Sequence, residues 1–77
     1  MSPKMRKAFD EAQTRLREWQ QTTPRALFTI WRQDNQIIAR CAVGDGPAFT
    51  MQFLPEVWQW AVEVLTSTVS KAPEVKS

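Results

Sequence analysis

Apolar side chains recur at intervals of three and four residues along the first part of the chain. They are Met5, Phe9, Ala12, Leu16 and Trp19. This spacing places them on one narrow stripe of an α-helix over about four turns. Ser2 is a favourable N-cap residue, and Pro3 suits the first helical position. Because Pro24 disfavours helical backbone at Thr23, we expect the helix to end near Gln21.

The period changes at residue 25. Residues 25–33 alternate between two faces and are rich in β-branched and aromatic types, which predicts a strand. Asp34 and Asn35 suit a two-residue hairpin turn, because both tolerate the positive φ of a type I′ turn. Residues 36–43 then form the returning strand. The turn sets four pairs opposite each other: Trp31 with Ile38, Ile30 with Ala39, Thr29 with Arg40, and Phe28 with Cys41.

A second turn at residues 44–47 is followed by another alternating segment, residues 48–54. Its large apolar residues, Phe49, Met51 and Phe53, share one face. A loop with an odd number of residues places them on the same face as the apolar residues of the hairpin, whereas an even loop splits the two sets. We therefore favour the odd loop, with a common face that also holds Phe28, Ile30, Ala39, Cys41 and Val43.

Pro55 opens a second helix that we expect to run to about Ser70. Glu56 lies near the positive end of its dipole and Lys71 near the negative end. The sequence thus predicts an α+β fold, a two-layer α-β-β-β-α domain with a three-stranded antiparallel meander and two flanking helices. It occupies residues 1–71, and residues 72–77 form a flexible C-terminal tail.

At ~100° of rotation per residue, the apolar residues of the second helix cover an arc of ~200° around its axis. This arc is about twice as wide as is usual for a surface helix. We expect its middle to face the sheet, through Val57, Ala61, Val64 and Leu65. The first helix can close one edge through Phe9, Leu16 and Trp19. The other edge then remains for a partner, and we expect Trp58, Val62 and Val69 to form that surface. Trp60, at the opposite edge of the arc, is a fourth candidate for partner binding.

Composition narrows the chemistry available to this chain. Its 77 residues include no histidine, no tyrosine and one cysteine, Cys41. This excludes a disulfide framework and a His/Cys metal site, and it argues against acid–base catalysis near neutral pH. The turn at residues 44–47 has two glycines but lacks the Gly-Lys-Ser/Thr of a phosphate loop. We therefore expect no enzymatic activity, no metal and no cofactor.

Two further features point to the compartment. The lone Cys41 lies in an apolar strand pattern, so we expect a buried, inert thiol of the kind found in reducing compartments. The N-terminal region lacks the apolar segment of a signal peptide, and no run approaches 18 apolar residues. We expect a cytoplasmic protein that does not enter a membrane.

Four tryptophans in so short a chain are the unusual feature. Tryptophan is a residue that protein interfaces bury as an anchor. The sequence therefore favours a non-catalytic protein-interaction module that binds a larger protein partner of unknown identity and forms a homodimer. Small domains of this type, rich in tryptophan and poor in reactive groups, suggest accessory or inhibitor proteins of phages and mobile elements.

The alternative is a single-stranded nucleic-acid-binding protein that uses the outer face of its sheet. Trp31 could stack on a base while Arg32 and Arg40 contact phosphates. The rest of that face is short of positive charge, and the net charge is only +2. Any affinity for nucleic acid should therefore be weak and mostly electrostatic.

Overall fold

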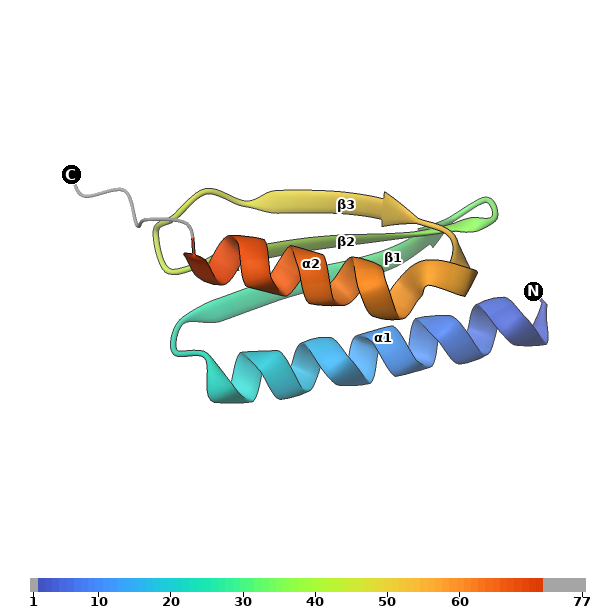
Figure 1. The fold of residues 1–77 in the computed structure, drawn as a ribbon, viewed down its shortest axis with the longest axis horizontal. Coiled ribbons are helices and arrows are strands. Elements are labelled where there is room, and N and C mark those ends of the chain that lie inside the picture. The colour runs from blue at the N-terminus through green and yellow to red at the C-terminus, as the bar shows by residue number, and fades with distance from the viewer. Residues whose placement is uncertain (1, 72–77) are drawn as a thin grey trace.

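A computed structural model describes residues 2–71 and confirms the order of helix, three strands and helix (Figure 1). The protein is an α+β domain in which two helices cover a three-stranded antiparallel sheet. Residues 72–77, which the sequence predicted to be a tail, lie outside the described residues. The elements are α1 (Pro3–Thr22), β1 (Ala26–Gln33), β2 (Gln36–Val43), β3 (Phe49–Phe53), a 3-10 turn η1 (Pro55–Val57) and α2 (Trp58–Lys71).

The ends of α1 follow from local chemistry. The backbone N–H of Met5 donates to Ser2 Oγ over 3.1 Å, so Ser2 is the N-cap that the sequence predicted. The helix ends at Thr22, one residue beyond the predicted end, because Thr23 is extended ahead of the proline. Gln20 Nε2 donates to the carbonyl oxygen of Ala26 over 3.0 Å and ties the last turn of α1 to the start of β1.

The register of the sheet confirms the predicted pairing of the hairpin. The turn itself is not the predicted type I′, because of its two central residues only Asp34 has a positive φ, 57°. Trp31 lies opposite Ile38, and the other three predicted pairs are also formed. The connection between β2 and β3 contains five residues, 44–48, an odd number as expected. Ala39 therefore lies between Ile30 and Met51, and the large apolar residues of all three strands share one face.

The start of β1 holds a feature that the sequence did not predict. Arg25 lies just before the strand and has a φ of 64°, in the left-handed region that residues other than glycine rarely adopt. It is the third residue of a turn in which Ala26 N–H donates to the carbonyl oxygen of Thr23 over 3.2 Å, and a turn with proline second, of type II, takes a positive φ at that position. Two further contacts join Arg25 to the loop after β2. The N–H of Gly44 donates to the carbonyl oxygen of Arg25 over 2.9 Å, and Arg25 Nη2 lies 3.4 Å from Asp45 Oδ2.

Both helices cover the same face of the sheet and run in the same direction (Figure 1). Helix α1 packs on β1, and α2 packs on β2 and β3. Two polar contacts join the helices at their ends. Lys4 Nζ lies 3.4 Å from Glu56 Oε1 at the first turns, and Trp19 Nε1 donates to Ser70 Oγ over 3.1 Å at the last turns.

The core between the two layers contains many small residues. Ala12, Ala39 and Ala61 have no exposed surface, and Ala8 is 5 % exposed. Small side chains on α1, α2 and β2 allow the two helices to approach each other and the sheet closely. The largest fully buried residues are Leu16, Ile37, Val62 and Cys41, and no polar or charged residue is buried within residues 2–71.

The structure corrects the predicted orientation of α2. Val62 and Val69, expected on a surface for a partner, are 1 % and 2 % exposed and belong to the core. Val57, expected against the sheet, is 43 % exposed. The reason is that α1 lies beside α2 on the flank that carries Val62, as the hydrogen bond from Trp19 to Ser70 shows. The predicted stripe of Trp58, Val62 and Val69 is therefore not an open surface.

The burial of Val62 determines the effect of a charge at that position. Val62→Glu should unfold the protein, because an unpaired buried carboxylate costs several kcal/mol and a chain of this size has only about 4–10 kcal/mol of stability. The matched control is Gln59→Glu, at an exposed position of the same helix, which should keep the wild-type melting temperature within a few degrees. Circular-dichroism melts of the two variants decide the point, and a wild-type melt for Val62→Glu would contradict it.

Candidate interaction surface

The flank of α2 that faces away from α1 carries an exposed apolar stripe. Its members are Val57, Trp60 and Val64, at spacings of three and four residues, and we call it the Trp60 stripe. Val57 is 43 % exposed, Trp60 is 62 % exposed and Val64 is half-buried. Trp60 is thus the most exposed large apolar side chain among the described residues.

The neighbouring tryptophan of the helix has a different environment. Trp58 is half-buried, packs against the core and lies near Glu11 and Arg15 of α1. Residues two apart on a helix are separated by ~200°, so Trp60 points away from α1. Of the four residues that the sequence predicted for partner binding, only Trp60 therefore lies on an open surface.

The Trp60 stripe lies on the same side of the molecule as the free edge of the sheet. Strand β3 pairs only with β2 in the described sheet, and α2 packs over both strands (Figure 1). Edge strands usually avoid association by means of charged residues, proline or bulges. The five residues of β3 include no charge and no proline, so neither of those two protections is present.

The outer face of the sheet is the second surface to consider. Trp31 is 39 % exposed there and lies opposite Ile38, which is 5 % exposed although no helix covers it. Arg40 is exposed on the same face, opposite Thr29. This part of the predicted nucleic-acid surface is thus brought together by the register.

Arg32 does not belong to that surface, so its predicted place beside Trp31 and Arg40 is wrong. It lies opposite Ile37 on the face that the helices cover, and its guanidinium carbon is 5.4 Å from the centre of the Phe9 ring. Consecutive strand residues point to opposite faces, so adjacent Trp31 and Arg32 cannot serve one sheet face. The alternation of the strand sequence was therefore sufficient to place Arg32 on the opposite face from Trp31.

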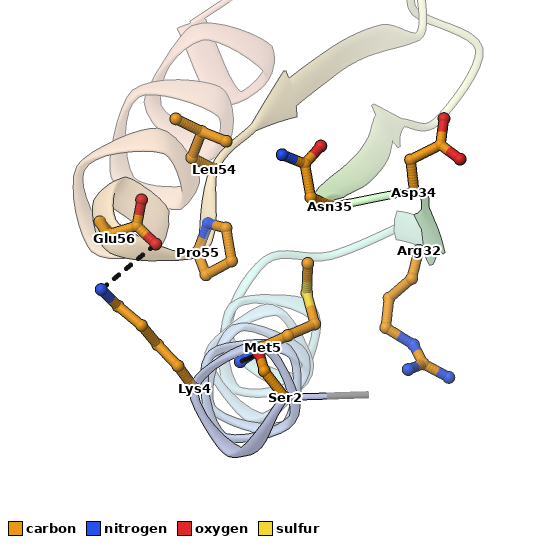
Figure 2. A pocket seen from close by; sticks show the side chains of 9 residues that line it. All are labelled: Ser2, Lys4, Met5, Arg32, Asp34, Asn35, Leu54, Pro55 and Glu56. Carbon is orange, nitrogen blue, oxygen red and sulfur yellow. Dashed lines mark hydrogen bonds and ion pairs between the residues drawn. The ribbon is translucent and has the colours of Figure 1, made fainter.

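A hollow of about 370 Å³ lies where the start of α1 meets the β1–β2 hairpin and η1 (Figure 2). Met5 points into it, and Lys4 and Glu56 form an ion pair at its rim. Arg32 and Asp34 add one charge of each sign, so the charges of the lining residues balance. The Ser2 hydroxyl in this hollow caps α1. These residues do not form a nucleophile–base pair of the kind that catalysis requires.

Cys41 is the other group that could carry chemistry. Its side chain is 1 % exposed on the inner face of the sheet, and burial raises the pKa of its thiol to about 12. The thiolate is the reactive form, so this cysteine is inert at neutral pH. Within residues 2–71, no group of three or more His, Cys, Asp and Glu side chains is placed to hold a metal ion.

Alkylation of Cys41 should therefore report unfolding. At pH 9 the folded protein keeps the thiol protonated, because its pKa is about 12, whereas the unfolded chain has a pKa near 9 and reacts readily. We expect iodoacetamide to label the folded protein at least tenfold more slowly than the protein in urea. Because the folded pKa is the higher one, stability should also fall as pH rises from 9 to 12. Equal labelling rates at pH 9 would contradict a buried thiol.

Comparisons with known proteins place no constraint on this surface. In residues 2–71, neither helix has the length and apolar character required to cross a membrane. A scan against models of protein families, a search of curated proteins and a search of solved structures found no match to this chain.

Proposed function

We propose that this protein is a non-catalytic interaction module that binds another protein chain through the Trp60 stripe and the adjoining edge of β3. The observation that carries the proposal is the exposure of Trp60, 62 % of whose surface faces solvent beside two valines. Tryptophan is strongly enriched among the residues that dominate the binding energy of protein interfaces. Full burial of such a side chain stabilises a complex by roughly 2–3 kcal/mol.

The remainder of α2 supports this assignment. Its core flank is buried through Ala61, Leu65 and Val69. Its polar residues Glu63 and Ser70 are exposed at other positions around the helix, and Ser67, seven residues after Trp60, continues the side that carries Trp60 with a small polar group. The first apolar side of α2 is buried in the core, and the second, which lies in solvent, is removed from water only when another molecule covers it.

A protein partner fits the exposed groups better than a nucleic acid does. Of the three residues predicted for nucleic-acid binding, Trp31 and Arg40 lie on the outer face of the sheet and Arg32 does not. The residues opposite Arg40 on the two neighbouring strands are both uncharged threonines, Thr29 and Thr50. The Trp60 stripe has no cation within it and suits an apolar partner surface. The module would act by covering an apolar surface of the partner chain.

An aromatic photo-crosslinking amino acid, p-benzoylphenylalanine, keeps a large apolar ring in place of the side chain that it replaces and tests the proposal at two matched positions. Trp60 and Leu27 are equally exposed, at 62 % and 60 %, and lie on α2 and on the outer sheet face respectively. We expect position 60 to yield crosslinked protein adducts, with purified protein or with lysate of the source cells, that excess unlabelled protein competes away. Position 27 should yield fewer than one fifth as many adducts.

The same experiment identifies the alternatives. Equal or stronger crosslinking from position 27 would overturn the proposal in favour of the outer sheet face. Adducts from position 27 that disappear after nuclease treatment would identify that face as a nucleic-acid surface. No competed adduct from either position, with purified protein or lysate, would remove the support that the exposure of Trp60 gives.

A further inference from the structure

The backbone geometry of β3 determines what kind of strand can pair with its free edge. Gly44 N–H donates to Arg25 C=O, so these residues form a hydrogen-bonded pair of the β1–β2 ladder. Such pairs alternate with non-hydrogen-bonded pairs in an antiparallel ladder. Carried along the register, the alternation directs Ala39 toward β3 and pairs it by hydrogen bonds with Met51.

It follows that Thr50 and Gln52 direct their backbone N–H and C=O groups outward. Each is one residue away from Met51 and so has the opposite orientation. An antiparallel strand that hydrogen-bonds to this edge must therefore present two outward-facing residues, also spaced by two. A second copy of β3 meets this requirement, with Thr50 of one copy opposite Gln52 of the other and Met51 opposite Met51 at the two-fold axis.

The side chains of β3 are arranged symmetrically about the same point. The strand reads Phe-Thr-Met-Gln-Phe, so apolar residues at positions 49, 51 and 53 alternate with polar residues at positions 50 and 52. A two-fold axis at Met51 sets Phe49 beside Phe53 of the second copy on the helix side. It sets Thr50 beside Gln52 on the outer side. Both faces of the joined sheet then keep their character, as an isologous contact requires.

The spacing between strands in the joined sheet would bring the two α2 helices into contact. Helix α2 lies over β2 and β3, so two copies joined at β3 would place their α2 helices two strand spacings apart, about 10 Å. Packed helices are separated by about 8–10 Å. The side of α2 nearest the free edge is the one that carries the Trp60 stripe, so the two stripes would meet over the axis.

Charges and area agree with this arrangement. The two α2 helices would be antiparallel, so that Lys71 in the last turn of one approaches Glu56 at the start of the other, and their dipoles oppose. No charge of β3 meets its own copy at the axis.

Helix α2 is about 20 Å long, and with the sheet below it the face covers a projected area of roughly 400 Å² per copy. Because side chains protrude from this face, its accessible area exceeds the projected area. The total for two copies therefore approaches the roughly 1,000 Å² that a specific interface needs.

We propose that the occupant of this surface is a second copy of the chain, joined through antiparallel pairing of the two β3 strands into a six-stranded sheet, with the two Trp60 stripes packed together above it. The inference rests on the proposed function and names its partner. It assigns the adhesive role to the backbone of Thr50 and Gln52 and to Trp60.

Proline at position 50 tests the strand pairing. Thr50→Pro removes an N–H that points outward and takes no part in the β2 ladder, so the monomer should remain folded. Thr50→Val keeps the N–H and is the matched control. By sedimentation equilibrium, we expect the wild type and Thr50→Val to be dimers at micromolar concentration and Thr50→Pro to dissociate at least tenfold more readily. Circular dichroism verifies that each variant is folded.

A cysteine at the axis gives a second test that does not depend on the proline variant. Opposed residues of a non-hydrogen-bonded antiparallel pair lie about 4.5 Å apart at Cα, within the range of a disulfide. Met51→Cys should therefore form a crosslinked dimer under mild oxidation, while Leu27→Cys on the outer face should not. The native Cys41 does not interfere because it is buried.

The outcomes separate this inference from the proposed function. A wild type that remains monomeric at millimolar concentration overturns the dimer, while the photo-crosslinking experiment still decides whether Trp60 binds a different protein. A dimer that tolerates Thr50→Pro and does not crosslink through Met51→Cys overturns the β3 pairing, but not self-association. Dimerisation lost in Thr50→Pro, together with a Met51→Cys crosslink, is the result we expect.

Discussion

The interaction on which this structure depends is the covering of one sheet face by two parallel helices. The sheet is only three strands wide, and α1 and α2 occupy its full inner face side by side. The core between the helices and the sheet is thin, because small side chains occupy it at Ala8, Ala12, Ala39 and Ala61. A thin core leaves little margin for the loss of any one layer, because a chain of this size buries a smaller fraction of its surface than a larger domain does.

Helix α2 relies on that contact more than α1 does. It contains several β-branched residues, which lose side-chain freedom in a helix and lower its intrinsic stability. Two of its threonines bond to carbonyl oxygens one turn back, Thr66 to Val62 over 2.8 Å and Thr68 to Val64 over 2.7 Å. The helix is therefore formed by burial against the sheet and α1, and its uncovered flank keeps apolar residues in solvent.

The polar groups of the structure serve the fold. Ser2 caps α1, Ser70 accepts from Trp19, and Gln20 joins α1 to β1. Cys41 is held protonated in the core by its raised pKa. The proposed function rests on other features, the apolar flank of α2 and the free edge of β3.

The sequence by itself determined the elements, the register of the sheet and the face that each strand residue occupies, because these depend on local periodicity and on loop length. The alternation of side chains along the strand also predicts that Arg32 lies on the helix-covered face, opposite to the face of Trp31. Only the tertiary structure decided which flank of α2 is open. Angles around a helix relate Val57, Trp60 and Val62 to one another but do not say where α1 will lie, and that choice buried Val62 and left Trp60 exposed. The left-handed backbone at Arg25 belongs to the local turn in which Ala26 N–H donates to the carbonyl oxygen of Thr23 behind Pro24, whereas its contacts with Gly44 and Asp45, distant in sequence, were decided by the tertiary structure.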